Sequence, residues 1–297
     1  MLKIKKIYYI ILICFITLSI ATIPTLKNDN TLRTNFEIEN ITGIKTNKVY
    51  LLNKNNYLTG VDIFLDKGNI KETVERIFNY LKESNNKMDS SFYGYIPDDA
   101  KIEEIRIDEK SLYLNISKEI KKDREKLKII IPGLVHSILE MPEIEYISLE
   151  IDSEYLEDDH KLLTKDYPIN VEYNFTDRNN INKVVIYYND KINNEDYYVP
   201  VTKYLNDNRE KVEIIVDELK SNIPANLISY INNKTELLNY TDENNALVLD
   251  FNKYIEDDKK ETTYQSIAYS IFNNYDIESV IYKIDGKIEK IINNTTK

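Results

Sequence analysis

The segment LYLNI at Leu112–Ile116 returns as LVLDF at Leu247–Phe251, and KVYLL at Lys48–Leu52 returns as KVVIY at Lys183–Tyr187. Both returns lie 135 positions along the chain (247 − 112 and 183 − 48). Solenoid repeats are shorter, at roughly 20–50 residues, whereas a domain commonly has about 100–150 residues. The sequence therefore predicts a duplicated domain.

The apolar pattern predicts the same order of elements in each copy. In the first copy, two β-rich segments (49–52 and 61–65) precede a helix, a hairpin (102–107 with 112–116), a second helix and a final strand (144–151). The second copy closes with a strand at 277–284. The helical stripes are Val74, Ile77, Phe78 and Leu81, matched by Val212, Ile215, Val216 and Leu219, and Leu134, Val135, Ile138 and Leu139, matched by Ile267, Ala268, Ile271 and Phe272.

This order, β-β-α-β-β-α-β in each copy, predicts an α+β fold. Each helix shows one apolar face and the strands partly alternate, so we expect two tandem two-layer α/β sandwich domains, each burying one sheet face beneath its helices. Pro132 is expected to mark or bend the start of its helix, because proline lacks the amide hydrogen that a helix interior uses.

The chain divides into five predicted segments. These are a transmembrane or signal segment (1–27), a polar tether (28–47), a first domain (48–156), a linker (157–182) and a second domain (183–292). Two interpretations of the linker stay open, a plain connection or an additional strand at Ile169–Phe175.

The N-terminal segment predicts export of both domains. Three lysines within Lys3–Lys6 precede an uncharged run, Ile7–Leu26, which reaches the length of about 20 residues that a membrane-spanning helix needs. The positive flank places the N-terminus in the cytoplasm. A cleaved signal peptide is the alternative, since Ser19–Ala21 offers small residues for cleavage. Lipidation at Cys14 is disfavoured because an isoleucine precedes it and the apolar run continues beyond it.

Composition excludes several classes of function. The 297-residue chain has a net charge of −11, which repels phosphate backbones, so no nucleic-acid partner is expected. Cys14 is the only cysteine, so an internal disulfide and a cysteine-based zinc or redox site are excluded. We predict no cofactor.

Three segments in each copy resemble a known family. They are YIPDDAKI (Tyr95–Ile102), LYLNISKEI (Leu112–Ile120) and MPEIEYISLEID (Met141–Asp152), then YINNKTELL (Tyr230–Leu238), LVLDFNKYI (Leu247–Ile255) and IDG (Ile284–Gly286). In this order and spacing the chain resembles tandem GerMN domains of sporulation and spore-germination proteins, over roughly 48–156 and 183–291. Asp98–Asp99 replaces the family's turn glycine, and Asn232 replaces a proline.

The resemblance implies a fold similar to the ring-building domains of sporulation secretion complexes. It also implies envelope-associated scaffolding, and it supplies no catalytic residues to carry over.

The densest polar cluster is Glu154–His160. Its carboxylates and imidazole could bind a divalent cation. The cluster lacks the alternating ligands and the glycine of an EF-hand loop, and the second copy has no counterpart. We therefore interpret it as a solvated acidic segment between domains.

Other candidate groups also have structural interpretations. The acid pairs Asp98–Asp99 and Asp257–Asp258 could serve a hydrolase, but they lie in predicted turns, where aspartate is favoured. His136 aligns with Tyr269, which suggests packing or a partly exposed helix flank. We predict no catalytic, cofactor-binding or metal-binding residue and no enzyme activity.

The chain has 24 tyrosines and no tryptophan. Tyr187–Tyr188 and Tyr197–Tyr198 flank the start of the second copy, and tyrosine is enriched in protein interfaces. Aromatic rings also stack on sugars. We interpret these residues first as half-buried strand residues.

Two hypotheses about function follow. The first is a non-enzymatic, membrane-anchored scaffold outside the cytoplasm, which assembles with itself or with envelope or sporulation proteins; head-to-tail contacts that close generate rings. The second is an extracytoplasmic module that binds peptidoglycan or another cell-wall ligand.

Overall fold

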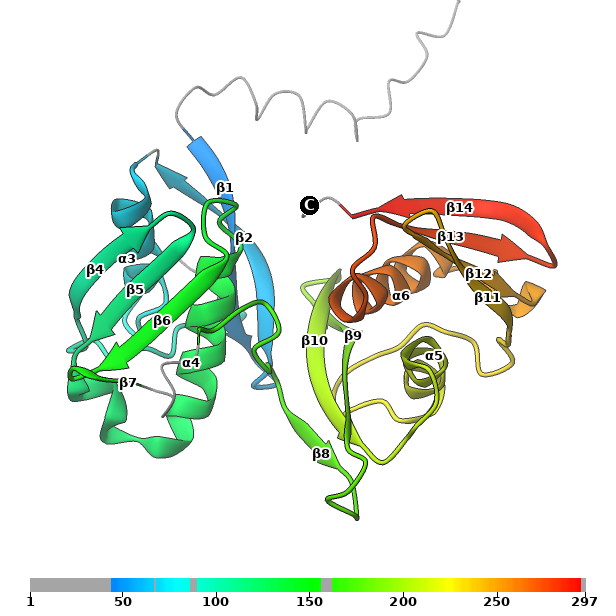
Figure 1. Ribbon diagram of the computed structural model, residues 1–297, viewed down its shortest axis with the longest axis horizontal. Coiled ribbons are helices and arrows are strands. Elements are labelled where there is room, and N and C mark those ends of the chain that lie inside the picture. The colour runs from blue at the N-terminus through cyan, green and yellow to red at the C-terminus, as the bar shows by residue number, and fades with distance from the viewer. Residues whose placement is uncertain (1–43, 67, 86–89, 156–161, 295–297) are drawn as a thin grey trace, which may run out of the picture. The chain divides into compact units, whose positions relative to one another are not determined.

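The computed structural model describes residues 44–66, 68–85, 90–155 and 162–294 (Figure 1). The predicted N-terminal segment and most of the predicted tether therefore lie outside the described residues. From Lys45 onward the described residues belong to one compact unit. Among them, no helix combines the length and the apolar character needed to cross a bilayer.

The two copies share the order β-β-α-β-β-η-α-β-β, and each has one further short strand, which follows the first helix in the first copy and precedes the first long strand in the second. The first contains β1 (Ile44–Asn53), β2 (Leu58–Asp66), α3 (Ile70–Tyr80), β3 (Phe92–Tyr93), β4 (Ile102–Asp108), β5 (Ser111–Ile116), η1 (Lys118–Lys122), α4 (Arg124–Leu139), β6 (Tyr146–Ile151) and β7 (Glu154–Tyr155). The second contains β8 (Glu172–Asn174), β9 (Asn182–Ile192), β10 (Glu195–Leu205), α5 (Lys211–Ser221), β11 (Leu237–Glu243), β12 (Ala246–Phe251), η2 (Lys253–Ile255), α6 (Lys260–Asn274), β13 (Ser279–Ile284) and β14 (Lys287–Asn293).

Each copy carries two separate sheets. In the first copy the strand orders are β2-β1-β3 and β4-β5-β6-β7; in the second they are β8-β10-β9 and β11-β12-β13-β14. Both four-stranded sheets have a parallel central pair and antiparallel outer pairs. The expected mixture of helices and sheets is present, but the prediction of one sheet per copy is wrong.

The helices lie between the two sheets of each copy (Figure 1). Helix α4 contacts both β2 and β6, and α6 contacts both β9 and β13. All residues from Ile130 to Leu139 of α4 are buried. A helical segment that is apolar on all sides must be covered on more than one side. The prediction assumed a single apolar face on each helix, and it therefore did not include the second sheet.

Pro132 lies in the middle of α4. The helix begins at Arg124, where the Asp123 carboxylate accepts hydrogen bonds from the backbone amides of Glu125 (2.9 Å) and Lys126 (3.3 Å). This N-cap, rather than the proline, sets the start of the helix. The prediction that Pro132 marks the start is therefore wrong.

Each four-stranded sheet ends in a hairpin that the predicted order omits. Strands β6 and β7 are joined by Asp152 and Ser153, and β13 and β14 by Asp285 and Gly286. All four residues have positive φ, between 46° and 82°. Two such residues between antiparallel strands form a type I′ turn, whose twist matches the strands it joins.

The predicted linker contains a strand. Residues Glu172–Asn174 form β8, which pairs in parallel with Lys203–Leu205 of β10. Of the two interpretations left open for this stretch, the structure shows the additional strand.

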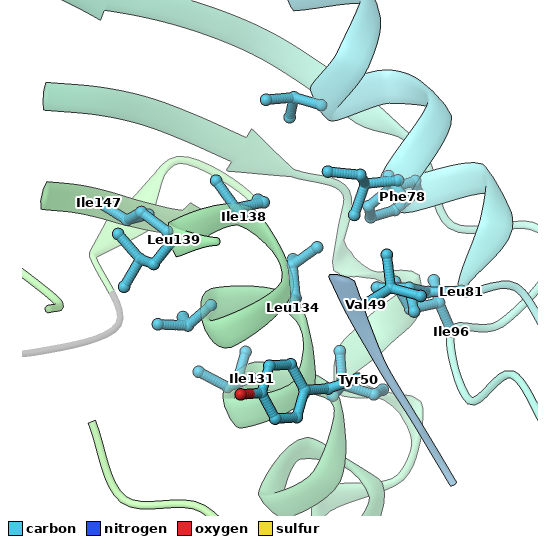
Figure 2. Close-up of a cluster of buried hydrophobic side chains, with 14 of the residues drawn as sticks. Val49, Tyr50, Phe78, Leu81, Ile96, Ile131, Leu134, Ile138, Leu139 and Ile147 are labelled. Carbon is cyan, nitrogen blue, oxygen red and sulfur yellow. The ribbon is translucent and has the colours of Figure 1, made fainter. Parts of the chain in front are cut away.

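The predicted helical stripes lie in the two hydrophobic cores. Figure 2 shows side chains from β1, α3, α4 and β6 gathered in the first core, with Phe78, Leu134 and Ile138 among them. In the second core, Val212, Ile215 and Ile267 are fully buried. Burial of one such side chain contributes about 1.5–3 kcal/mol to folding.

The first strands of the two copies match at an offset of 137 (187 − 50). The amide of Tyr50 donates a hydrogen bond to Ser137 Oγ (2.8 Å), and the amide of Tyr187 donates to Ser270 Oγ (2.9 Å). Each serine hydroxyl donates to a carbonyl one turn earlier in its own helix. The offset of 135 expected for these strands is therefore wrong. A slip of two residues keeps every side chain on its own face, so the apolar pattern cannot reveal it.

Candidate functional site

Equivalent faces of the two copies meet. Asn53 and Asp190 occupy equivalent positions under the corrected offset, and Asn53 Nδ2 donates a hydrogen bond to Asp190 Oδ2 (2.8 Å). Tyr50 and Tyr187, a second equivalent pair, also interact. Strand β2 contacts its own counterpart, β10. Contact between equivalent residues defines an isologous, two-fold-like pairing.

Half-buried amide side chains fasten this pairing. Asn170 Oδ1 accepts from the amide of Leu58 (2.8 Å), and Asn170 Nδ2 donates to the carbonyls of Leu58 (2.8 Å) and Pro200 (2.7 Å). Asn55 Nδ2 donates to Asp190 Oδ2 (2.9 Å), so this buried carboxylate accepts from two residues of the first copy. Hydrogen bonds to ionised groups are the stronger ones, and we therefore expect the junction to be rigid.

Replacing Asp190 by alanine is expected to destabilise the protein by about 1–3 kcal/mol, because the buried Asn53 amide then loses its charged acceptor. Equilibrium unfolding in urea measures the change. Asp242→Ala, at an exposed position of β11, is the matched control and should change stability by less than about 0.5 kcal/mol. Equal stability of the two variants would contradict a junction fastened at Asp190.

A cavity of about 710 Å³ lies beside the pairing and is lined by both copies. Its lining includes equivalent positions from the two copies: Tyr50 with Tyr187, His136 with Tyr269, and Glu140 with Asn273. Small-molecule sites typically measure about 300–1,000 Å³. The cavity is therefore the candidate binding site of this protein.

Aromatic rings form much of its wall. The ring centroid of Tyr269 lies 5.5 Å from that of Tyr187 and 5.0 Å from that of Tyr198. On the side of the first copy, Tyr50 and His136 have centroids 5.4 Å apart. These tilted and edge-to-face arrangements are the ones that aromatic quadrupoles favour.

The titratable groups of the aromatic wall are uncharged at neutral pH. Burial, together with the neighbouring Tyr187 hydroxyl and Glu140 carboxylate, raises the pKa of Tyr50 well above its usual range. Burial also raises the pKa of Tyr187, and it raises that of Tyr198 to about 12. The wall thus offers neutral hydroxyl groups, each able to donate and to accept a hydrogen bond.

His136 is a buried packing residue. It is 7% exposed, and its Nε2 lies 2.7 Å from the carbonyl oxygen of Tyr167. Burial lowers the pKa of His136 to about 4. Of the two expectations for His136, packing is confirmed, and the histidine is more buried than a helix flank.

This low pKa predicts a pH-dependent stability. The unfolded histidine has a pKa of about 6.5, so between about pH 6.5 and pH 4 only the unfolded state binds the proton. Stability should therefore fall as the pH falls through this window, by on the order of 3 kcal/mol from His136 alone. In His136→Phe, urea unfolding at pH 7 and pH 4.5 should show a smaller difference than in the wild type. Identical pH dependence of the two proteins would contradict the assignment.

The predicted acidic cluster is only partly described. Glu154 lies in β7 and pairs with Lys121 (2.8 Å), while residues 156–160 lie outside the described residues. Within the part of the chain that the structure describes, no group of three or more histidine, cysteine, aspartate or glutamate residues is placed to hold a metal ion.

The acid pairs sit in turns, as predicted. Hydrogen bonds from the Ser84 hydroxyl and from the Ser84 amide (3.0 Å to Oδ1) lower the pKa of Asp98, and Asp99 pairs with Lys122. Asp257 Oδ1 accepts from the amide of Lys259 (2.9 Å) at the start of α6. The structure does not bring these pairs to the cavity.

The tyrosine pairs divide between core and cavity. Tyr188 is fully buried in the second core, whereas Tyr187, Tyr197 and Tyr198 line the cavity. Sequence reasoning missed Tyr50, the first-copy partner of Tyr187. The available signal was a tyrosine at equivalent strand positions, which the two-residue error in offset concealed.

The chain thus belongs to the class of proteins built from two tandem copies of one α/β domain, here joined through equivalent faces. A family model described as "Germane: Sporulation and spore germination" matches residues 48–157 and 173–290. The chain belongs to this family, which confirms the resemblance to GerMN domains.

The sequence and the solved structure of GerM from Bacillus subtilis agree with this assignment. The chain is 24% identical over 272 residues to the spore germination protein GerM of Bacillus subtilis (strain 168), covering 82% of this chain and 72% of GerM. The solved tandem GerMN domains of the sporulation protein GerM from Bacillus subtilis match with a TM-score of 0.75 and 21% identity, covering 86% of this chain and 98% of that one. The fold is therefore that of tandem GerMN domains.

Proposed function

We propose that this protein is a non-enzymatic scaffold of the cell envelope with a GerM-like role in sporulation or germination. In this proposal the N-terminal segment anchors the chain in the membrane and both copies lie outside the cytoplasm. Family membership supports the biological role. The lysines before the uncharged run Ile7–Leu26 support the orientation.

The observation that supports a scaffold role most directly is the packing of one copy against the other through equivalent faces. The domain pairs with its own kind through polar contacts such as Asn53 with Asp190. Because that face is occupied within the chain, assembly between chains must use other surfaces.

Strand β14 is the surface that we assign to assembly. It is an edge strand of its sheet, and edge strands present unpaired backbone groups to other chains. Ile288 is 63% exposed and Ile291 is 52% exposed. We propose that β14 pairs with an edge strand of a second copy of this protein, and that envelope partners use the same mode.

Self-association of the full-length protein in detergent tests this proposal. Sedimentation velocity over a range of concentrations should show oligomers, and Ile288→Lys combined with Ile291→Lys should remove them. The control Ile223→Lys, at a 40% exposed position outside β14, should leave them intact. A wild-type protein that stays monomeric, and that cross-links to no membrane protein in cells, would exclude the scaffold.

Location is tested separately, in cells that express the full chain. The two copies should be degraded by protease added to intact protoplasts, and the protein should sediment with membranes. Protection from protease until the cells are lysed would contradict the proposed orientation.

A further inference from the structure

We infer that the cavity between the two copies binds a neutral oligosaccharide, with Tyr198 and Tyr269 as its stacking platforms. This inference is argued separately from the scaffold proposal. The cavity exists within one chain, and its stacking platforms lie on β10 and α6. Ile292 and Asn293 of β14 also line it, but the assembly proposal rests on the exposed Ile288 and Ile291 of that strand, which do not. The inference specifies the ligand class for the second hypothesis from the sequence, in which the protein is a module that binds a cell-wall ligand.

The shape and size of the site fit such a ligand. The volume of about 710 Å³ lies within the usual range of small-molecule sites. Tyr198 and Tyr269 are half-buried, with their rings at 80° to each other, so they present two differently oriented apolar surfaces. A pyranose ring offers an apolar C–H face bordered by hydroxyl groups, and a tyrosine ring combines an apolar face with a polar tip.

The polar groups of the lining suit sugar hydroxyls. Gln265 and Asn273 bring side-chain amides, each with donors and an acceptor, and Glu140 brings a carboxylate acceptor. The Asn273 amide and the Glu140 carboxylate already lie near the Tyr187 and Tyr50 hydroxyls, at 3.5 Å and 3.3 Å. These long contacts leave room for ligand hydroxyls to form better ones, since a good bond between such groups is shorter.

The charge of the site disfavours an anionic ligand. Acidic side chains outnumber basic ones in the lining, where Asp62, Glu140, Asp166 and Asp196 stand against Lys48 and Lys165; Asp196 is paired with Lys259 (2.9 Å), which leaves an excess of one carboxylate. Lys48 lies in the first copy and Lys165 in the linker, and no other lysine or arginine of the described residues lines the cavity. A phosphate-rich polymer or lipid headgroup would be repelled, whereas an uncharged saccharide is not.

The aromatic wall is also uncharged in itself. High pKa values keep the hydroxyls of Tyr50, Tyr187 and Tyr198 protonated, and a low pKa keeps His136 neutral. At this wall a neutral polyol meets neutral donors and acceptors, and the polyol itself carries no charge that must lose its hydration on entry.

Binding is measured with the full-length protein and two defined probes, chitotetraose and cellotetraose. Isothermal titration calorimetry measures the binding, because the chain has 24 tyrosines and their total emission would not isolate the two platforms. We expect saturable binding of at least one probe. Tyr198→Ala and Tyr269→Ala should each weaken binding by about tenfold or more, while Tyr269→Phe should retain it because the ring remains.

The matched control is Tyr173→Ala. Tyr173 is 70% exposed and stacks on Tyr204, and it does not line the cavity. The Tyr173→Ala variant should bind the tetrasaccharide with the affinity of the wild type. Thermal melting should show that every variant is folded. Absence of saturable binding of both tetrasaccharides up to about 10 mM, an equal loss in Tyr173→Ala, or tighter binding of a cell-wall stem peptide would each overturn the inference. None of these results bears on β14 and self-association.

Discussion

Replacing Glu218 by leucine is expected to destabilise the protein by about 3–5 kcal/mol, because it leaves the ammonium group of Lys203 buried without its closest carboxylate. Lys203 is 1% exposed, and its Nζ lies 2.7 Å from Glu218 Oε2. The remaining partners, the carbonyl of Asn222 and the more distant Glu172 (3.5 Å), compensate only in part. Equilibrium unfolding in urea gives the free energy of unfolding.

Two further variants separate charge burial from packing. Lys203→Met combined with Glu218→Leu should recover much of the lost stability, since an apolar pair needs no charge compensation. Glu125→Leu breaks an exposed pair with Lys128, whose side chains are 80% and 72% exposed, and should cost less than about 1 kcal/mol. If the double variant is no more stable than Glu218→Leu alone, the unpaired charge is not the cause.

Alanine at Gly94 is expected to destabilise the first copy by more than about 3 kcal/mol, because an added Cβ collides with backbone. An ideal Cβ at this position lies 2.1 Å from the carbonyl oxygen of Lys82 and 2.6 Å from its carbon. The chain crosses itself tightly here, where the amides of Tyr95 and Ile96 both donate to the carbonyl of Leu81. The clash therefore cannot relax by a change of rotamer.

Gly60→Ala is the matched control. A Cβ at Gly60 meets the flexible side chain of Lys48, at 3.0 Å, and the Tyr50 ring at an ordinary 3.7 Å. The change in unfolding free energy should therefore stay below about 1 kcal/mol. Thermal and urea unfolding of both variants should separate them clearly. Similar stabilities would mean that the crossing at Lys82 can open at little cost.

Local patterns predicted much of each copy. The stripe Val74–Leu81 predicted α3 because helical spacing places those side chains on one face. The hairpin of β4 and β5 was predicted from two apolar segments and a polar turn, and the structure pairs Ile102 with Ile116 and Asp108 with Ser111. These elements depend on neighbours in sequence, which is the information that periodicity carries.

Long-range relations were not predictable in this way. The separation of the β1–β2 hairpin into its own sheet depends on which face of α4 it covers. The run Ile130–Leu139 is buried on every side and gives no direction. The cavity needs Tyr50 and Tyr187 to meet across 137 positions (187 − 50), and only the hydrogen bonds to Ser137 and Ser270 establish that correspondence. Single residues such as these carry no periodic signal.

The pairing of equivalent faces within one chain also has a consequence for evolution and for mass action. Covalent linkage holds the faces at an effective concentration of about millimolar, so dilution does not separate them. A dimer of one single-copy gene product would carry identical residues on both sides. Fusion removes that restriction, and the two sides have diverged: His136 of the first copy corresponds to Tyr269 of the second, and Glu140 to Asn273. A duplicated chain can therefore line a cavity at this pairing with different residues on its two sides, which a symmetric homodimer cannot do.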